Sequence, residues 1–213
     1  MTENNFEEET FTGLENANKV ILGIISDSHI PDRANSLHPE ILPTFIKAKV
    51  DVILHAGDIC IPSVITQLES VAPVYAVKGN RDVYFLNNLP MVRIMTFAGH
   101  RIALVHGHGR WNRYFFNKIK MFIIGYHLNI FLPTIFNSIP ETEVVVFGHI
   151  HRPINLWYNK KRLLFNPGSS SSVIVQSISP SIGIIRLEAG KPAVGEIIKL
   201  KGVRLKNRRW INI

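Results

Sequence analysis

Residues 20–26 read VILGIIS, an unbroken run of aliphatic and β-branched residues that ends at the polar triplet Asp27-Ser28-His29. Such a run is typical of a strand that is buried on both faces of a sheet. Two similar runs follow at residues 51–55 (DVILH) and 74–77 (VYAV), and residues 37–49 and 62–69 between them have helical patterns. Strands that alternate with helices pair in parallel, so this half of the chain predicts an α/β fold.

The second half of the chain predicts hairpins. Apolar runs of strand length occur in pairs, separated by short turns such as Ala98-Gly99-His100 and Asn159-Lys160. Parallel units followed by hairpins predict two mixed sheets packed face to face, with helices outside. The predicted strands of this half are residues 92–97, 101–106, 144–147, 154–158, 162–165, 182–187 and 194–200, and residues 111–136 are predicted to be helical.

Composition excludes several classes of protein. Of the 213 residues, 46% are hydrophobic and 19% charged, which excludes a disordered chain. The single cysteine, Cys60, excludes an internal disulfide and a cysteine-rich zinc module, and it fits a reducing, cytoplasmic location. The N-terminus lacks a signal-peptide pattern, and polar residues and a proline interrupt the most apolar stretch, 121–136. We therefore expect neither export nor a transmembrane helix.

The charge is positive overall and unevenly distributed. Lys and Arg number 24 against 16 Asp and Glu, a net charge of +8. Residues 1–18 contain five glutamates and no basic side chain, whereas residues 199–213 contain six basic side chains. We expect residues 1–18 to form a mobile acidic arm and residues 19–213 to form one domain that ends in a basic tail. A basic body favours anionic partners such as phosphate esters, nucleic acid or lipid headgroups.

Polar clusters that contain Asp, His or Asn directly follow five of the predicted strands. Ligands of α/β sheets bind outside the carboxyl ends of the strands, so these five clusters predict a single site. Residues i and i+2 point to the same side of an extended segment. Asp27 and His29 can therefore reach one ion, and His149 and His151 can reach two adjacent ions. The clusters are Asp27-x-His29, Gly57-Asp58, Gly79-Asn80, His106-Gly107-His108 and Gly148-His149-x-His151.

The side chains in these clusters indicate divalent metal ions. Carboxylate and imidazole ligands without thiolate suit manganese, iron, zinc or nickel. Seven candidate ligands are too many for one tetrahedral ion and suit two ions that share a carboxylate. Two divalent ions, two carboxylates and one hydroxide leave one net positive charge, which favours a phosphate oxyanion. Two such ions can hold the attacking and the leaving oxygen of an in-line displacement.

With these motifs the sequence resembles the calcineurin-like metallophosphoesterase superfamily, and most closely its compact phosphodiesterase branch. The matching motifs are Asp27-Ser28-His29, Gly57-Asp58, Gly79-Asn80-Arg81-Asp82, His106-Gly107-His108, Gly148-His149-Ile150-His151 and Asn166-Pro167-Gly168-Ser169. The resemblance implies a four-layer αββα sandwich with a dinuclear metal site at the strand carboxyl ends. It implies that Asp27, His29 and His151 hold one ion, Asp58 bridges, and Asn80, His106 and His149 hold the second ion.

The resemblance also implies a reaction. The protein would be a metal-dependent phosphodiesterase that acts on a small phosphate ester, with a metal-bridging hydroxide as nucleophile and manganese as the favoured metal over iron, zinc or nickel. Asn80, Arg81 and His108 are the candidate catalytic residues. Many superfamily members have histidine where this chain has Arg81. Arginine cannot act as a general acid but can bind phosphate oxygens in a bidentate fork, which favours diesters over monoesters. His108 is either a proton donor, a substrate contact or a histidine without a catalytic role.

A second departure from the compact pattern is the long apolar segment at about residues 110–140. Phe115, Ile119, Phe122, Tyr126 and Ile130 recur at helical spacing, with basic residues beside them. Such a helix can be buried on the core or in a homodimer seam. It can also form a lid over the substrate site, or lie on an anionic membrane surface as a peripheral contact.

Two functions from other classes compete with the phosphodiesterase. The superfamily includes a retromer subunit that resembles this chain and serves as a protein-binding platform, so a catalytically silent scaffold is the alternative. A scaffold is expected to have lost metal ligands, whereas His29, Asp58 and the other five candidates are all present. The basic tail suggests a nucleic-acid enzyme, but the chain has no recognisable RNA- or DNA-binding motif, so a nucleic-acid partner is not expected.

Overall fold

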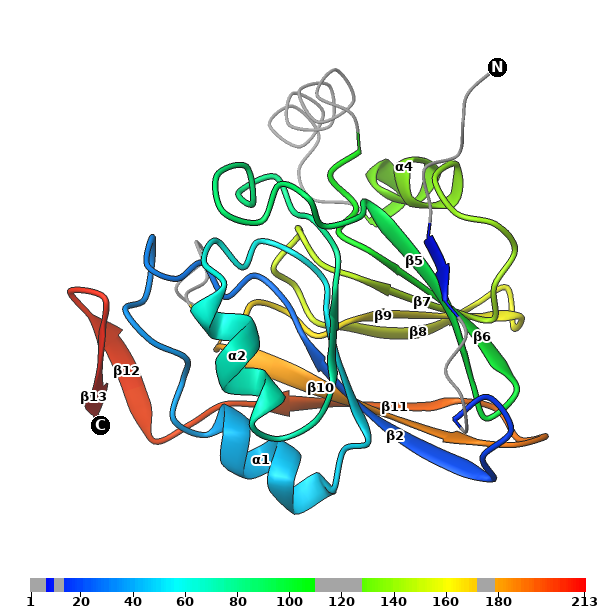
Figure 1. Ribbon diagram of the computed structural model, residues 1–213, viewed down its shortest axis with the longest axis horizontal. Helices are drawn as coiled ribbons and strands as arrows, with labels where there is room; N and C mark the ends of the chain where they lie inside the picture. The colour runs from blue at the N-terminus through cyan, green and yellow to red at the C-terminus, as the bar shows by residue number, and fades with distance from the viewer. Residues whose placement is uncertain (1–6, 10–13, 110–127, 172–178) are drawn as a thin grey trace.

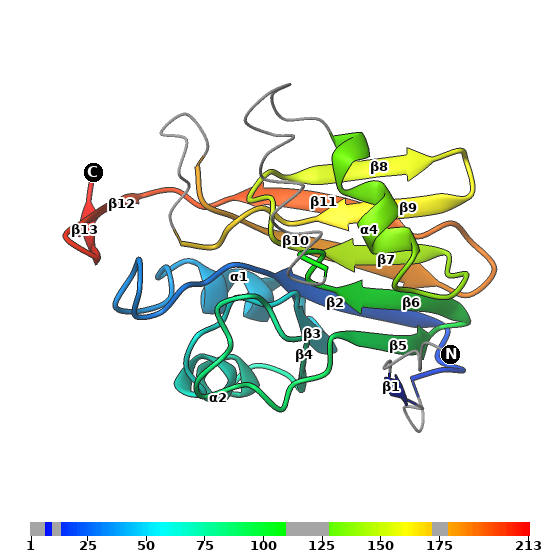
Figure 2. The same cartoon turned by 90° about the horizontal axis from the view of Figure 1, so that it is seen from above.

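Two mixed β-sheets packed face to face form the body of the protein (Figure 1, Figure 2). The computed structural model describes residues 7–9, 14–109, 128–171 and 179–213. The first sheet has five strands in the order β11-β10-β2-β3-β4. Its strands β2, β3 and β4 are parallel, as the strand–helix alternation predicts, and β10 is antiparallel to both β2 and β11. The bounds are β2 Lys19–Ile25, β3 Val52–His55, β4 Val74–Ala76, β10 Ser181–Glu188 and β11 Val194–Lys199.

The second sheet has six strands in the order β1-β5-β6-β7-β9-β8. β6, β7 and β9 are parallel, while β5 and β8 pair antiparallel with their hairpin partners β6 and β9. The hairpins and their approximate bounds confirm the sequence prediction. The strands are β1 Glu7–Glu9, β5 Val92–Phe97, β6 His100–Val105, β7 Val144–Phe147, β8 Ile154–Tyr158 and β9 Arg162–Asn166.

Strand alternation divides the apolar residues between an inner core and two outer ones. Val20, Leu22 and Ile24 of β2 face the second sheet and pack with residues such as Phe97 and Phe165 in the core between the sheets. Neighbouring positions point outward because successive side chains of a strand lie on opposite faces. Both faces of β2 are therefore covered, as its unbroken apolar sequence predicts.

Helices cover the outer face of each sheet and complete four αββα layers (Figure 1). α1 and α2 pack on the five-stranded sheet, through residues that include Phe45 and Leu68. α4 and the preceding 3₁₀ helix η1 pack on the six-stranded sheet, where Ile135 is buried. The predicted sandwich is confirmed. The helix bounds are α1 Ile41–Ala48, α2 Ser63–Glu69, η1 Leu128–Ile130 and α4 Leu132–Phe136.

The first helix is shorter than the prediction of residues 37–49. It begins at Ile41, where the backbone N–H donates to the carbonyl of His38, and Pro43 lies in its first turn. A proline is tolerated there because its missing N–H would have no partner within the helix. The helix ends at Ala48, and the next residue, Lys49, has a left-handed φ of 53° and donates its N–H to the carbonyl of Ile46.

Parts of both termini have defined places against the domain. Within the predicted acidic arm, Glu7–Glu9 form β1 and pair in parallel with β5, and Leu14 packs against the core between the sheets. The segment predicted only as a basic tail contains a hairpin of β12 (Val203–Lys206) and β13 (Arg209–Asn212). Trp210 holds this hairpin against the segment that precedes α1, because its Nε1 donates to the carbonyl of Ser36 at 2.9 Å and its ring contacts His38.

Most of the apolar segment lies outside the described residues. The helix predicted over 111–136 is seen only as η1 and α4, and residues 110–127 are not described. The proposed dimer seam, lid and membrane contact of this segment therefore remain predictions. In the part of the chain that the structure describes, no helix is long and apolar enough to cross a membrane.

Candidate metal centre

The predicted ligands follow the carboxyl ends of strands in both sheets. Asp27 follows β2, Asp58 follows β3 and Asn80 follows β4, all from the parallel part of the five-stranded sheet. His106 and His149 follow β6 and β7 of the facing sheet. Parallel strands end at the same edge, so loops that are far apart in the sequence meet there.

Three of the predicted ligands form one compact group. His151 Nε2 lies 3.1 Å from Asp27 Oδ1, and His29 Nε2 lies 3.8 Å from the same oxygen. The two imidazole Nε2 atoms are 3.2 Å apart. All three side chains are buried. One carboxylate oxygen and two imidazole nitrogens therefore converge closely enough to bind a single ion.

Asp58 lies between this group and His106. Its Oδ2 is 3.8 Å from His29 Nε2, and its Oδ1 is 3.5 Å from His106 Nε2. Asp27, Asp58 and His106 form a second compact group of ligand atoms. The two oxygens of one carboxylate thus face two different sets of ligands, which is the arrangement that a bridging ligand requires.

Several buried polar atoms at this place have no hydrogen-bond partner among the described residues. They include Asp27 Oδ1, Asn80 Oδ1 and His106 Nε2. Buried polar atoms are nearly always hydrogen-bonded, because leaving one unsatisfied costs about 1–3 kcal/mol. These three are an oxygen of a carboxylate, an oxygen of an amide and a nitrogen of an imidazole, which are ordinary ligands of divalent cations. The residues present therefore fit a metal centre.

His149 and His108 lie beside His106. The ring centroids of His106 and His149 are 5.1 Å apart, those of His106 and His108 5.3 Å, and those of His108 and His149 6.3 Å. Neither residue belongs to the compact groups found among the described residues. The structure thus brings all three histidines together at the site.

Hydrogen bonds occupy one polar atom of Asp27 and one of His106, and they leave the other polar atom of each side chain facing the site. Asp27 Oδ2 accepts hydrogen bonds from Ser26 Oγ at 2.6 Å and from the His149 backbone N–H at 3.1 Å, so its Oδ1 is left for a ligand. His106 Nδ1 lies 2.6 Å from the carbonyl of Ala56 and must donate to it. That bond selects the tautomer whose Nε2 lone pair is free to coordinate.

Asp82 organises two of the ligand loops, a role that the sequence motif alone did not reveal. This fully buried carboxylate accepts four backbone N–H groups, two on each oxygen. The donors are Asp58 at 2.9 Å, Ile59 at 2.9 Å, Cys60 at 2.7 Å and Gly79 at 2.8 Å. Asp82 therefore ties the loop after β3 to the loop after β4.

The ligand loops have an unusual backbone conformation. Five of the predicted ligands have left-handed φ values, an arrangement that costs free energy for any residue with a Cβ and that clusters at functional sites. Surrounding contacts such as those of Asp82 must hold the loops in this form. The five are Asp27 (52°), His29 (48°), Asp58 (55°), His149 (70°) and His151 (54°).

Two glycines are required because the loops pass very close to one another. A Cβ at Gly79 would collide with the backbone nitrogen and Oδ1 of Asp58. A Cβ at Gly148 would collide with Ser26 Oγ and lie 2.7 Å from the carbonyl of Ala56. The sequence motifs Gly-Asn and Gly-His therefore reflect this close approach of ligand loops.

Two arginines lie near the ligands. The backbone N–H of Arg81 donates to Asp58 Oδ1 at 2.7 Å, while its side chain is half exposed and pairs with Asp32 at 3.4 Å. Arg33, which the sequence motifs did not single out, places Nη1 3.1 Å from Nδ1 of His151. One guanidinium is thus half exposed and pairs with Asp32, and the other contacts a predicted ligand.

Burial and charge set the protonation of the site. Burial lowers the pKa of His29 to about 3 and holds that of His149 well below its ordinary value. Burial, together with the nearby Asp27, raises the pKa of Asp58 to about 6. Burial also opposes ionisation of Asp27, but His151, His106 and His29 outweigh it and hold the Asp27 pKa well below its usual range. His29 and His149 are therefore neutral imidazoles, as metal coordination requires. At His106 burial is outweighed by the carboxylates of Asp58 and Asp27, which raise the pKa.

The fold and the site together define a class, namely α/β sandwich proteins with a divalent-metal site at the strand carboxyl ends. Residues 20–190 match the family model of the calcineurin-like phosphoesterase superfamily domain. The chain belongs to this family, as its motifs predict. Membership indicates a hydrolase that acts on phosphoesters with divalent metal.

Individual relatives agree with this assignment. A probable metallophosphoesterase of Methanothermobacter thermautotrophicus is 31% identical over 180 residues, which cover 84% of this chain and 92% of the relative. Vacuolar Protein Sorting 29 of Cryptosporidium parvum has a similar fold, with a TM-score of 0.67 at 18% identity over 92% of this chain and 96% of that one. A structure described as a novel archaeal phosphodiesterase has a TM-score of 0.55 at 22% identity, over 85% of this chain and 100% of that one.

Proposed function

We propose that this protein is a metal-dependent phosphodiesterase. The observation that carries the proposal is the position of Asp58, whose two oxygens face His29 at 3.8 Å and His106 at 3.5 Å. Together with the unpartnered ligand atoms, this carboxylate makes a centre for two ions more suitable than a centre for one. Two divalent ions held there would supply Lewis acidity and an activated water as nucleophile near neutral pH.

The residues divide into two ligand sets around the shared carboxylate. We assign Asp27, His29 and His151 to one ion, and Asn80, His106 and His149 to the other, with Asp58 common to both. Oxygen and imidazole ligands without thiolate suit manganese first, with iron, zinc or nickel as substitutes. The tautomer of His106, set by its bond to the Ala56 carbonyl, supports its role as an Nε2 ligand.

Arg81 favours a diester over a monoester. Its guanidinium is 52% exposed at the rim, and its backbone is anchored to the bridging carboxylate. It can therefore reach a phosphate oxygen without leaving its loop, and it neutralises charge without supplying a proton. The fold shared with an archaeal phosphodiesterase supports the same choice.

His108 serves as a substrate contact in this proposal. Burial and the neighbouring His106 lower its pKa to about 3, so its ring is neutral near pH 7. A neutral imidazole can hydrogen-bond to a phosphate or a leaving-group oxygen but holds no extra proton to give. Asn80 is the other candidate catalytic residue, and its amide Oδ1 is buried and has no hydrogen-bond partner among the described residues.

A protein-binding scaffold is the second candidate. It is favoured by the similarity to Vacuolar Protein Sorting 29, whose TM-score of 0.67 exceeds that of the archaeal phosphodiesterase. The complete set of seven candidate ligands in this chain favours catalysis instead. We further propose a small phosphate ester as substrate, no nucleic-acid partner, and a cytoplasmic location in keeping with a single free cysteine.

Hydrolysis of a chromogenic phosphodiester and the matching monoester tests the function. Metal-stripped protein is assayed before and after addition of Mn²⁺, beside Asp58→Asn and the control Asp51→Asn. Asp51 is an exposed carboxylate before β3, at the opposite edge of the sheet. We expect manganese-dependent diester cleavage that Asp58→Asn loses and Asp51→Asn retains. Absence of turnover with Mn²⁺, Zn²⁺, Fe²⁺ and Ni²⁺, while bound metal is detected by elemental analysis, would refute the enzyme and favour the scaffold.

A further inference from the structure

The family motif Asn166-Pro167-Gly168-Ser169 begins a buried polar loop that supplies no candidate ligand. It starts at the last residue of β9 and continues through Ser170 and Ser171, and all three serines are buried. β9 is parallel to β7, so this loop leaves the sheet at the same edge as the ligand loop after β7. A buried polar loop must satisfy its hydrogen-bonding groups, so its partners indicate what it holds in place.

The hydroxyl groups of the loop hold the backbone of Asp27. Ser169 Oγ donates to the carbonyl oxygen of Asp27 at 2.8 Å, and Ser171 Oγ donates to the same oxygen at 3.2 Å. The backbone N–H of Ser170 donates to the carbonyl oxygen of Ser26 at 3.0 Å. The loop therefore fixes both peptide groups that flank Asp27. A carbonyl oxygen has two lone pairs, so the two hydroxyls occupy it fully.

These bonds complete the partners of Asp27 and leave one atom over. Its backbone N–H donates to the carbonyl oxygen of Gly57 at 3.0 Å, and its Oδ2 accepts the bonds from Ser26 and His149. Oδ1 alone has no hydrogen-bond partner among the described residues. The φ of 52° is one that a residue with a Cβ adopts only when its surroundings hold it there. The protein thus holds Asp27 in the orientation that turns Oδ1 toward the site.

The same loop is tied to a second ligand loop and to the neighbouring sheet. Asn166 Nδ2 donates to the carbonyl oxygen of Gly148, in the loop after β7, at 2.8 Å. Ser181 at the start of β10 donates its Oγ to the carbonyl of Pro167 at 2.6 Å and its N–H to the carbonyl of Ser169 at 2.9 Å. β9 and β10 belong to different sheets. The loop therefore has anchors of its own, and these remain when the two serine hydroxyls are removed.

We propose that Ser169 and Ser171 are positioning residues that set the metal affinity of Asp27. The inference rests on the proposed role of Asp27 as a metal ligand. Loss of both hydroxyls leaves its buried carbonyl without these two donors, and the backbone then relaxes from the left-handed conformation and turns Oδ1 away from His29 and His151. Side chains that orient a ligand without contacting the ion change the affinity for the metal in this way.

Isothermal titration calorimetry of the full-length, metal-stripped protein with Mn²⁺ tests the inference. Ser169→Ala, which removes the shorter bond, is expected to weaken binding about threefold, because Ser171 still donates to the carbonyl. Ser169→Ala combined with Ser171→Ala is expected to weaken it about 10- to 100-fold. The loss in the double variant should exceed the product of the losses in the single variants, since each hydroxyl compensates for loss of the other. Asp27→Asn, in the same assay, tests the ligand role itself and is expected to lose tight binding.

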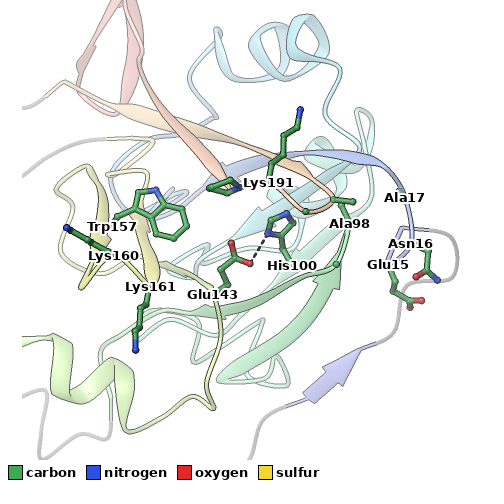
Figure 3. Close-up of a pocket in the computed structure, with 14 residues that line it drawn as sticks. Glu15, Asn16, Ala17, Ala98, His100, Glu143, Trp157, Lys160, Lys161 and Lys191 are labelled. Atoms are coloured by element: carbon green, nitrogen blue, oxygen red, sulfur yellow. Dashed lines mark hydrogen bonds and ion pairs between the residues drawn. The ribbon is translucent and has the colours of Figure 1, made fainter.

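A matched control comes from the opposite edge of the sandwich. Five segments line a cavity of about 910 Å³ there, beside Trp157 (Figure 3). In its wall, His100 is buried and places Nδ1 2.9 Å from Glu143 Oε2 and Nε2 3.1 Å from the carbonyl oxygen of Glu188. β6 begins at His100 and is followed by His106, so this pair lies about 20 Å from the metal centre, because each strand residue adds about 3.3 Å. His100→Ala therefore removes two hydrogen bonds of a buried side chain, as the serine double variant does, without touching a ligand loop.

Urea unfolding of the same metal-stripped proteins separates positioning from stability. His100→Ala is expected to lower the urea midpoint comparably to the serine double variant and to keep the wild-type affinity for Mn²⁺. The inference is overturned if the double variant binds Mn²⁺ as the wild type does, if the two serine losses simply multiply, or if His100→Ala loses affinity in step with its stability. Unchanged affinity in both single serine variants would overturn it even if the double variant did not fold. Wild-type affinity in Asp27→Asn would instead refute the proposed ligand role.

Discussion

Replacement of Asp82 by asparagine is expected to destabilise the protein through the loops that carry Asp58 and Asn80. Each oxygen of Asp82 accepts two backbone N–H groups at 2.7–2.9 Å, and the side chain is fully buried. Asparagine keeps one acceptor oxygen and turns an amino group toward two N–H donors. Two hydrogen bonds to a charged acceptor are lost, at about 1.5–3 kcal/mol each, so the free energy of unfolding should fall by about 3–6 kcal/mol.

The effect can be measured by urea unfolding of metal-stripped protein, which separates stability from metal binding. Thermal unfolding gives a second measure. For a chain of this size, each kcal/mol of stability corresponds to about 2–4 °C in Tm, so we expect the Tm of Asp82→Asn to be about 6–24 °C lower. Metal affinity should also fall, about 10- to 100-fold, because Asp82 positions a ligand without contacting the ion.

Asp51→Asn is the matched control for this experiment. Asp51 is exposed, and its Oδ2 accepts a single backbone N–H, that of Ile21, at 2.7 Å. Its replacement should lower the free energy of unfolding by less than about 1 kcal/mol. A loss for Asp82→Asn that is no larger than the loss for Asp51→Asn would refute the reasoning from the four converging N–H groups.

Three further predictions follow from buried contacts of the site and its surroundings. Gly148→Ala should weaken metal binding at least about tenfold, measured by calorimetry, because its Cβ would displace Ser26 and the ligand loop; unchanged affinity would contradict the close approach. Burial lowers the pKa of His55 to about 4, against an ordinary 6.5. The unfolded chain therefore binds this proton first as the pH falls, so His55 alone should contribute a loss of about 3 kcal/mol in metal-free stability between pH 6.5 and 4; a urea midpoint that falls no more steeply over that window than the midpoint of His55→Gln would argue against it. Trp210→Ala removes the bond to Ser36 and should expose the C-terminal hairpin, with tryptic cleavage about fivefold or more faster; equal cleavage rates would show that the hairpin is held by other contacts.

The convergence of the candidate ligands at one site was predictable because their types and their positions after strands are both local features. Asp27 and His29 follow a strand that is recognisable from composition, and the same holds for Asp58 after the next strand. Convergence of strand ends then brings them together. The role of Asp82 was not predictable, because its four backbone partners become neighbours only when two loops fold against each other.

The C-terminal hairpin shows a different kind of limit. Residues 203–206 alternate apolar and basic side chains, and Asn207-Arg208 adopts left-handed φ values of 49° and 61° at the turn. This alternation is typical of a strand, but the density of positive charge led to the prediction of a basic tail. The contact of Trp210 with Ser36, 174 residues earlier in the chain, places the hairpin, and no local pattern encodes a contact of that range.

The sequence by itself determined most strands of the sandwich and the chemical types of the candidate metal ligands. Both depend on the order of neighbouring residues, namely apolar runs of strand length and the Asp, His and Asn that follow them. Only the tertiary structure decided which atoms of those ligands are free, since hydrogen bonds from Ser26 and to Ala56 occupy the others. It also made the cavity beside Trp157, because five segments that are separate in the chain enclose it. Local sequence sets the conformation of a segment, whereas packing between segments sets what each side chain is able to bind.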